Sequence, residues 1–318
     1  MPRAYAGAMT RLLALAVDFG GTKVEAALVD DRGHLVPGSR HRRPTGTDAT
    51  SSVLDASVRD AVEAARAALP AGGTLVGVGI GAAGPVDVEH GLVSPLNVPA
   101  WRDHPLAASV SAVVPDAPVT LRIDGLCIAL AEHWIGAGNG APNLLGMVVS
   151  TGVGGGLVLG GRAASSPTGN GGHIGHVEVG GFDDPCACGG RGCLEAVASG
   201  PRTVAWARTQ GFTGETGEEL AVAHEAGDPI AVAAVARAGD AIGHAIASAT
   251  SLLDLDVVAI GGGFSRVSPA LFDHARAALA ERLAFPFVSR VEIVPSGLSD
   301  EGPLIGAAAL VHRPEFLA

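Results

Sequence analysis

The chain has 318 residues, which suits one large domain or two moderate ones, and 47% of them are hydrophobic, enough for a sizeable core. The formal net charge of −11 disfavours broad contact with nucleic acids or anionic membranes, because those surfaces are themselves negative. No apolar run reaches the roughly 18 residues that cross a bilayer. From the charge and the absence of such a run, we expect neither a nucleic-acid nor a membrane partner.

The first residues of the chain lack the apolar segment of a signal peptide. The first apolar run, Leu12–Val17, is too short to serve as one. We therefore predict a cytoplasmic protein. Met9 is an alternative start, which would make residues 1–8 an extension.

Strands and helices are predicted to alternate from the beginning of the chain. The apolar runs Leu12–Val17 and Val24–Val29 flank a glycine turn, a pattern typical of a β-hairpin. Apolar spacing near 3.6 predicts a helix over Ser51–Leu69, ending before Pro70. A buried strand is predicted at Leu75–Ile80.

A second strand–turn–strand unit follows. The strand Val119–Ile123 leads into a helix at Leu126–Trp134, and the strands Leu144–Val149 and Gly156–Leu159 then flank another glycine turn. This alternation predicts an α/β fold, and the two hairpins predict two related lobes with a cleft between them. The remaining predicted helices are Pro201–Gln210, Gly217–Ala226, Pro229–Leu253, Ser268–Leu283 and Gly302–Val311, with strands at Val257–Ile260 and Val291–Val294.

The turn between the first two strands has the chemistry of a nucleotide phosphate site. Gly20 and Gly21 let backbone N–H groups approach phosphate oxygens closely. Thr22 adds a hydroxyl donor and Lys23 a positive charge. Asp18, at the strand end, could hold Mg²⁺ or its waters. The alternative interpretation is an ordinary hairpin turn.

Two later glycine-rich turns could serve the same nucleotide. The turn Ser150–Gly154 could grip the phosphates from the second lobe, and Gly261–Gly263 is placed like an adenosine contact. Each turn alone is equally well an ordinary turn, but their occurrence together favours a nucleotide. The residues assigned to nucleotide contact are Thr151, Gly152, Gly154, Gly261, Gly262 and Gly263.

Two other nucleotide-binding fingerprints are not met. Gly79–Gly84 matches G-x-G-x-x-G after a strand, but Pro85–Asp87 indicates a turn where a dinucleotide site requires a helix. The P-loop pattern G-x-x-x-x-G-K-[ST] is absent from the sequence.

Three of the four cysteines fall within eight residues, which in a cytosolic protein indicates a metal rather than disulfides. His176 with Cys186, Cys188 and Cys193 would complete a closed tetrahedral Zn²⁺ site. Four protein ligands leave no open position, so such a zinc would be structural. The alternative is three reduced structural cysteines.

These motifs together resemble the ROK family, which comprises bacterial sugar kinases and sugar-responsive repressors. The most specific part of the resemblance is Gly169–His176 with Cys186–Glu195, where the spacing from the histidine through the cysteines to the glutamate matches the family signature. Asp18–Lys23 and Ser150–Gly156 are similar to its two phosphate motifs. The likeness is to glucokinases of the actinobacterial type.

The resemblance implies an actin-like fold of two ribonuclease-H-like domains that close on ATP and a sugar, usually in a homodimer or homotetramer. We place a small domain at residues 1–122 and 304–318, and a large one at 123–303. Repressor members carry an N-terminal helix-turn-helix domain. The first phosphate motif begins here at residue 18, so we expect no such domain.

Asp124, between a predicted strand and helix, matches the family's catalytic aspartate. As general base it would accept the proton of a sugar hydroxyl, that at C6, while the oxygen attacks the γ-phosphorus of ATP beside Mg²⁺. The alternative is a helix N-cap.

Several residues are expected on the sugar side. Glu195 and His176 would contact sugar hydroxyls, His176 with the ring nitrogen that does not bind zinc. Gly84 and Asn97 are further candidates from the small lobe, and the alternative for Asn97 is a structural role.

Two positions depart from the family pattern. Ile123 replaces the usual asparagine, and His173 replaces the usual glutamate of E-x-G-H. A site that lacks these hydrogen-bonding partners can lose discrimination steeply. The chain could therefore bind glucose differently, prefer an amino, N-acylated or deoxy sugar, or be a sugar-binding regulatory protein with little kinase activity. The sequence leaves open a phosphoryl donor other than ATP, such as polyphosphate.

Overall fold

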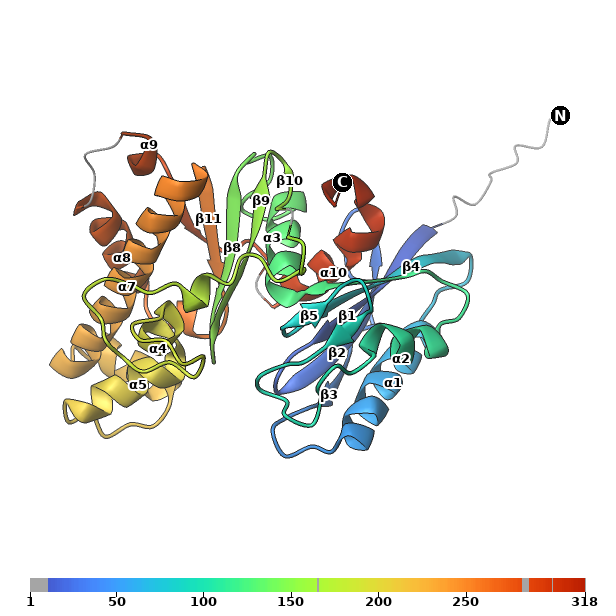
Figure 1. Cartoon of the computed structure of the whole chain (residues 1–318), viewed down its shortest axis with the longest axis horizontal. Helices are drawn as coiled ribbons and strands as arrows, with labels where there is room; N and C mark the ends of the chain where they lie inside the picture. Colours follow the sequence, from blue (N-terminus) through green and yellow to red (C-terminus); the bar gives the residue numbers. More distant parts are fainter. Residues whose placement is uncertain (1–10, 165, 282–285, 299, 318) are drawn as a thin grey trace. The chain divides into compact units, whose positions relative to one another are not determined.

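The computed structural model describes residues 11–164, 166–281, 286–298 and 300–317 (Figure 1). Two of the sequence-based assignments lie outside these residues: the alternative start at Met9, and the end of the helix predicted to reach Leu283.

The chain divides into two compact units. The first comprises residues 11–127 with 303–317, and the second comprises the described residues of 128–302. The division falls inside helix α3 (Asp124–Trp134), whereas the sequence-based assignment placed it just before this helix. Asp124 therefore belongs to the first unit.

The first unit is built on a mixed sheet with strand order β3-β2-β1-β4-β7. Strands β1, β2 and β3 pair antiparallel, while β1, β4 and β7 pair parallel. Apolar residues occupy both faces of β1 because both faces are buried. The strands are β1 Arg11–Phe19, β2 Lys23–Asp30, β3 His41–Pro44, β4 Gly73–Ala82 and β7 Val119–Ile123.

The register of this sheet aligns the carboxyl ends of its parallel strands. Asp18 of β1 pairs with Gly81 of β4, and Gly81 pairs in turn with Arg122 of β7. Asp124 follows β7 directly. The edge where ligands bind in parallel α/β sheets therefore carries both Asp18 and Asp124.

Helices α1 (Ser51–Ala67) and α2 (Leu106–Val113) contribute apolar residues to the core of the first unit. The Thr50 hydroxyl accepts a hydrogen bond from the Val53 N–H at 3.4 Å and caps α1. The two helices are tied together by Arg66, which donates to a carbonyl at the end of α2 at 2.7 Å.

Helix α10 (Gly302–His312) packs against the sheet through small residues. A Cβ atom added to Gly79 of β4 would lie 1.8 Å from the carbonyl oxygen of Ala307. Only glycine permits this close approach of helix and strand.

The second unit contains a sheet with strand order β10-β9-β8-β11-β12. Strands β8 and β9 form the second glycine-turn hairpin, and β8, β11 and β12 run parallel. The strands are β8 Leu144–Val149, β9 Val153–Leu159, β10 Arg162–Ala163, β11 Val257–Gly261 and β12 Glu292–Pro295.

Helix α7 (Pro229–Leu253) is the core helix of the second unit, and it corrects the expectation that no apolar segment is long enough to cross a membrane. By length and composition this helix could cross a membrane, but most of its apolar stretch is buried inside the second unit. Gly243 lets it approach α8 (Ala270–Glu281), since an added Cβ would lie 2.3 Å from the Ala275 carbonyl oxygen. The other helices of this unit are α4 Leu194–Ala198, α5 Gly200–Thr209, α6 Gly217–Glu225 and α9 Pro286–Ser289.

The predicted helices and strands are present, some with the predicted bounds and others with ends shifted by a few residues. The elements that were not predicted are mostly short: β3, α2, α4, α9, β10, the ribbon β5 (Val86–Asp87) with β6 (Leu92–Val93), and 3₁₀ turns at Ile174–His176, Phe264–Arg266 and Pro314–Phe316.

Candidate functional site

The first glycine turn is held in shape by backbone bonds. The Gly20 N–H donates to the Lys23 carbonyl at 2.9 Å. Thr45, just after β3, donates from its hydroxyl to the Gly20 carbonyl at 2.8 Å and from its N–H to the Thr22 carbonyl at 3.0 Å. Thr45 was not predicted, because only the pairing of β3 with β2 brings it to the turn.

Asn97 lies against this turn. A Cβ atom on Gly21 would come within 2.9 Å of the Asn97 Cβ. The loop that carries Asn97 is anchored by buried Trp101, whose ring stacks on Phe19 at a centroid distance of 4.5 Å and whose Nε1 donates to Ser51 Oγ at 3.0 Å. The structure therefore brings Asn97 and the first turn together, as a shared site requires.

Asp18 and Asp124 are carboxyl groups whose surroundings oppose ionisation. Burial raises the pKa of Asp18 to about 7, and the nearby charge of Asp124 adds to this effect. Burial likewise raises the pKa of Asp124 to about 6, although the Gly125 N–H donates to its Oδ1 at 2.7 Å. A carboxylate with a raised pKa is a suitable proton acceptor. The hydrogen bond from Gly125 also suits a residue that begins a helix.

Lys23 does not stand alone beside the turn. Its Nζ donates at 3.0 Å to Glu25, a side chain only 2% exposed that also binds Arg40 at 3.1 Å and Arg42 at 2.6 Å. Burial disfavours the charge of Glu25, yet hydrogen bonds from Arg40, Lys23 and Arg42 hold its pKa below the usual value. Arg42 of β3, and Arg40 just before that strand, were missed because β3 has too few residues for recognition.

Ile123 and Gly84 occupy the ends of β7 and β4. Ile123 is 3% exposed and belongs to the hydrophobic core of the first unit. Gly84 lies in the turn after β4, next to Ala83, whose N–H donates to the Phe19 carbonyl at 2.8 Å. The isoleucine that replaces the family's asparagine therefore packs as an apolar core residue.

In the second unit, the two predicted glycine turns lie together. The Ser150 N–H donates to the Gly152 carbonyl at 2.9 Å. Gly262 has a φ of +99°, and a Cβ there would lie 2.5 Å from the Val149 carbonyl oxygen. An added Cβ on Gly263 would lie 3.4 Å from Ser150 Oγ. Glycine is thus required at position 262 for the turns to meet.

A cavity of about 470 Å³ opens beside these turns, a volume within the range of small-molecule sites. It is lined by Ser150, Thr151 and Gly263 together with the beginnings of α5 and α6. The α6 contribution includes Thr216, which caps that helix. Sequence reasoning missed the helical walls, although the Thr216–Glu219 capping box was visible as a signal.

Glu195 connects the second turn to the cysteine cluster. Its Oε2 accepts a hydrogen bond from the Val153 N–H at 3.0 Å, and an added Cβ on Gly152 would lie 2.6 Å from the same oxygen. Glu195 is on α4, two residues after Cys193. The predicted sugar ligand therefore also fixes the predicted phosphate turn.

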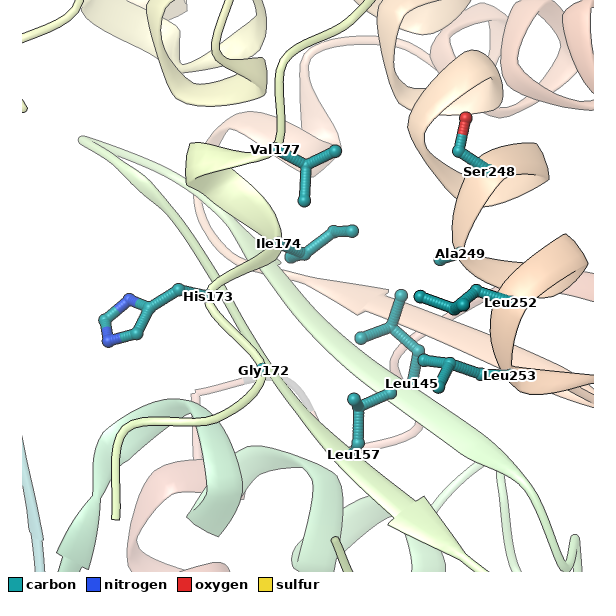
Figure 2. A pocket seen from close by; sticks show the side chains of 10 residues that line it. All are labelled: Leu145, Leu157, Gly172, His173, Ile174, Val177, Ser248, Ala249, Leu252 and Leu253. Carbon is teal, nitrogen blue, oxygen red and sulfur yellow. The ribbon is translucent and has the colours of Figure 1, made fainter. Parts of the chain in front are cut away.

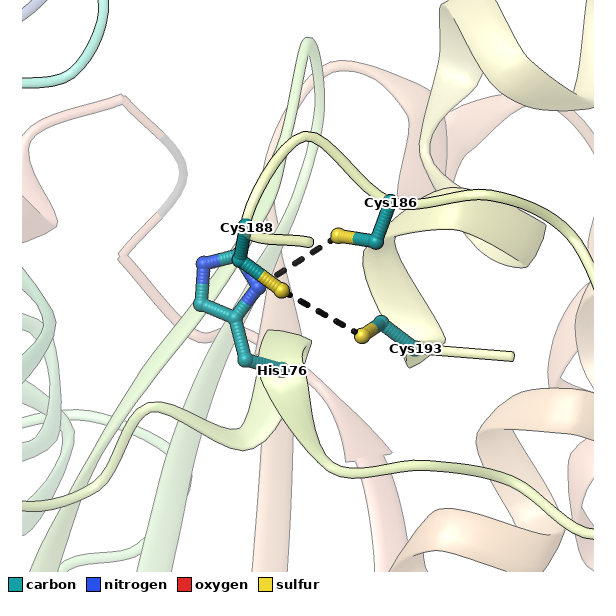
Figure 3. A group of neighbouring side chains, drawn as sticks. All are labelled: His176, Cys186, Cys188 and Cys193. Atoms are coloured by element: carbon teal, nitrogen blue, oxygen red, sulfur yellow. Dashed lines mark hydrogen bonds between the residues drawn. The ribbon is translucent and has the colours of Figure 1, made fainter. Parts of the chain in front are cut away.

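The four predicted metal ligands converge (Figure 3). Their ligand atoms all lie within 4.8 Å of one another, with His176 Nδ1 3.7 Å from Cys186 Sγ and the Sγ atoms of Cys188 and Cys193 3.6 Å apart. Two sulfurs bound to zinc at 2.3 Å in a tetrahedron are separated by about 3.8 Å. The donor set and its spacing thus fit a closed structural Zn²⁺ site, with the Nε2 atom of His176 directed away from it.

His173 precedes this cluster, with its ring centroid 5.9 Å from that of His176. Burial lowers the pKa of His173, and so does the neighbouring His176, whereas Glu195 has the opposite effect. Figure 2 shows His173 projecting away from Ile174 and Val177, which face Leu252 of α7 across an apolar pocket of about 250 Å³. The segment from His173 to Val177 therefore directs the His173 imidazole to one side and its apolar side chains to the other.

Each unit contains a mixed β-sheet with a glycine-turn hairpin, together with helices. The polar residues gather at the turns and at the carboxyl ends of the strands. This combination defines the actin-like class of ATP-using proteins. The sequence pattern of the ROK family matches residues 14–314, and the chain belongs to that family. The predicted family and fold class are both confirmed.

Relatives with assigned activities cover nearly the whole chain. It is 30% identical over 321 residues to the glucokinase of Streptomyces coelicolor, covering 95% of this chain and 98% of that protein. It is 34% identical over 307 residues to the N-acetyl-D-glucosamine kinase of Salmonella newport, covering 92% and 97%.

A solved structure with the same fold is that of a ROK family glucokinase from Streptomyces griseus in complex with glucose and AMPPNP. It is 28% identical to this chain, superimposes with a TM-score of 0.81 and covers 95% of this chain and 99% of that one.

Proposed function

We propose that this protein is a carbohydrate kinase that transfers the γ-phosphoryl group of ATP to a hydroxyl of a hexose, that at C6. The observation that carries the proposal is the placement of Asp124, with its raised pKa, at the same sheet edge as Asp18 and the first glycine turn. The assigned activities of relatives, a glucokinase and an N-acetyl-D-glucosamine kinase, support phosphorylation of a hexose.

Asp124 is assigned the role of general base. Its carboxylate accepts the hydroxyl proton as the sugar oxygen forms a bond to the γ-phosphorus, and the bond from that phosphorus to the β,γ-bridging oxygen breaks to release ADP. The proton leaves on Asp124 and passes to solvent after product release.

The nucleotide is assigned to three glycine-rich turns, two for its phosphates and one for its adenosine. The N–H groups of Gly20 and Gly21 and the Thr22 hydroxyl would donate to phosphate oxygens, as would the turn Ser150–Gly154. The cavity beside Gly263 would hold adenosine. The Asp18 carboxylate offers the oxygen ligand that Mg²⁺ prefers, and Mg²⁺ bound there would neutralise phosphate charge.

Zinc is assigned a structural role. His176, Cys186, Cys188 and Cys193 would hold it, and it would fix the ring of His176 and the start of α4, which carries Glu195. Both side chains are proposed sugar contacts. Glu195 would accept a sugar hydroxyl with Oε1, while its Oε2 holds the Val153 N–H.

Two altered positions bear on which sugar is bound. His173 offers an imidazole where the family pattern has a carboxylate, and the Ile123 side chain offers no hydrogen bond. The proposed substrates are therefore glucose or a glucose-like hexose, including amino and N-acylated sugars. We place the reaction in the cytoplasm, where the cysteines stay reduced, and expect a homodimer or homotetramer.

The test is a panel of hexoses with Mg²⁺-ATP, read as sugar-dependent ADP release, with polyphosphate as a second donor. We expect release with at least one hexose. Asp124→Asn should lower kcat by about 10²- to 10⁴-fold while leaving the KM for sugar within a few-fold, since it removes the base and keeps the shape. Tight sugar binding without any ADP release would instead establish a sugar-binding regulatory protein, one of the alternatives that the changes at Ile123 and His173 leave open.

A further inference from the structure

Arg237, on helix α7, contacts the segment that carries the cysteines. We call residues 179–193 the knuckle loop. The Nη2 of Arg237 donates to Asp184 Oδ2 of this loop at 2.6 Å. Its Cζ lies 5.1 Å from the ring centroid of Phe182, also in the loop, and 5.2 Å from that of Trp206 on α5. The Arg237 side chain is only 17% exposed.

The knuckle loop reaches the hydrophobic core of the unit through buried Val179 at its start and through partly buried Phe182. Between Gly180 and Gly192, Phe182 is the one large apolar side chain in the sequence. The Arg237 guanidinium thus combines cation–π contact with two aromatic rings and a charge-assisted hydrogen bond to a carboxylate. Arg237 therefore joins Asp184 to α7 and lies beside Phe182, whose ring also approaches that of His244 of α7 at a centroid distance of 6.5 Å.

Backbone hydrogen bonds carry this attachment to the metal ligands. The Gly192 N–H donates to the Asp184 carbonyl at 2.8 Å, and the Val179 N–H donates to the Gly192 carbonyl at 2.8 Å. Gly192 directly precedes Cys193, and Asp184 stands two residues before Cys186. Holding Asp184 thus holds both the beginning and the end of the cysteine cluster.

We propose that Arg237 is a positioning residue that, with Phe182, Asp184 and Trp206, anchors the knuckle loop independently of the metal. The anchor keeps the cysteines near their binding geometry when zinc is absent, slows the loss of bound zinc, and keeps His176 in place for the sugar. The last two effects rest on the proposed function, whereas the first does not.

The chain supplies a matched control within the same loop. Arg191 forms a bidentate pair with Asp183, at 2.6 and 2.7 Å, but both side chains are exposed and both belong to the loop. Such a pair connects the loop only to itself, and exposed ion pairs contribute little. Arg191→Met removes the same chemical groups as Arg237→Met without removing the attachment to α7.

The experiment compares Arg237→Met, Arg237→Lys and Arg191→Met with the unmodified protein. In chelator-treated protein, hydrogen exchange of the amides of residues 179–193 should become about tenfold faster in Arg237→Met and stay unchanged in Arg191→Met. In untreated protein, release of zinc to a chromogenic chelator should be about tenfold faster in Arg237→Met, in line with the effect of residues that support metal ligands.

Steady-state kinetics provides a further readout. Arg237→Met should raise the KM for the sugar about fivefold, while kcat and the KM for ATP stay within about twofold, since the catalytic base and the nucleotide turns are untouched. Arg237→Lys should restore part of each effect, because lysine can pair with Asp184 but lacks the planar guanidinium that contacts the two rings.

Equal exchange and equal zinc release in Arg237→Met and Arg191→Met would overturn the proposal. The exchange comparison in metal-free protein decides the anchor even if the purified protein contains no zinc or phosphorylates no sugar. Should Arg237→Met fail to fold, Asp184→Asn takes its place, and unchanged exchange in that variant would equally overturn the anchor.

Discussion

Two carboxyl groups at one sheet edge set the chemistry of the first unit. Asp18 is 9% exposed, and its pKa rises to about 7 mainly through burial and then through the charge of Asp124. The pKa of Asp124 rises to about 6 through burial. Both are therefore poised to exchange protons near neutrality, unlike solvent-exposed aspartates with pKa values near 4.

The raised pKa of Asp124 predicts how activity depends on pH. The base must be ionised, so kcat/KM for the sugar should fall as pH drops through about 6 and should become level above about 7.5. The measurement is a profile of kcat/KM across this range at saturating Mg²⁺-ATP. The residual activity of Asp124→Asn should lack the acidic limb. A wild-type profile that is level down to pH 5 would contradict the role of Asp124 as base.

At the scale of elements, close contact between helices and strands depends on glycines. Gly79 of β4 lies against Ala307 of α10, and Gly243 of α7 lies against Ala275 of α8. The small residues of α10 thus have a specific partner, because a helix can come near a strand only where neither carries a bulky side chain. The short strand β3 has a similar supporting role, since it supplies Arg42 to Glu25 and ends next to the first glycine turn.

Gly79→Ala should destabilise the first unit. The added Cβ would lie 1.8 Å from the Ala307 carbonyl oxygen, a backbone atom that cannot rotate away, so helix and strand must separate. We expect a loss of about 3 kcal/mol in the free energy of unfolding, at the upper end of overpacking effects. Chemical denaturation measures it. Gly180→Ala is the control, because its Cβ would meet nothing within 4 Å, and equal stability of the two variants would contradict the packing argument.

At the scale of the whole molecule, the cysteine cluster is connected to distant parts of the second unit. Glu195 joins α4 to the turn at Val153, and Arg237 joins the knuckle loop to α7. The four candidate metal ligands, the proposed sugar contacts and one proposed nucleotide turn are therefore connected within this unit.

Removal of zinc should consequently impair sugar binding. Cys186→Ser, or extended chelation, should abolish stoichiometric zinc and raise the KM for sugar by about 10- to 100-fold, because His176 and Glu195 lose their support. Metal analysis and steady-state kinetics test this together. Cys127→Ser, outside the cluster, should retain zinc. Freshly purified protein without zinc would refute the structural role of the metal.

The sequence by itself determined the fold class, the long elements and the chemistry-bearing motifs. Strands and helices with a clear period, such as α1 and α7, are recognisable because their apolar faces repeat within one segment. The Cys₃His set and the glycine turns are recognisable because their residues are close in sequence, and the ligand atoms of the set do converge.

Only the tertiary structure decided which distant residues support these motifs. Thr45, Glu25 with Arg42, and Arg237 each act across pairings or packing that no local pattern encodes. Likewise, the family pattern marks Ile123 as an altered sugar position, yet its burial in the core is a matter of how β7 packs. The reason is physical: short-range order arises from the repeat of side chains along one element, whereas partners distant in the chain are selected by the packing of the whole unit.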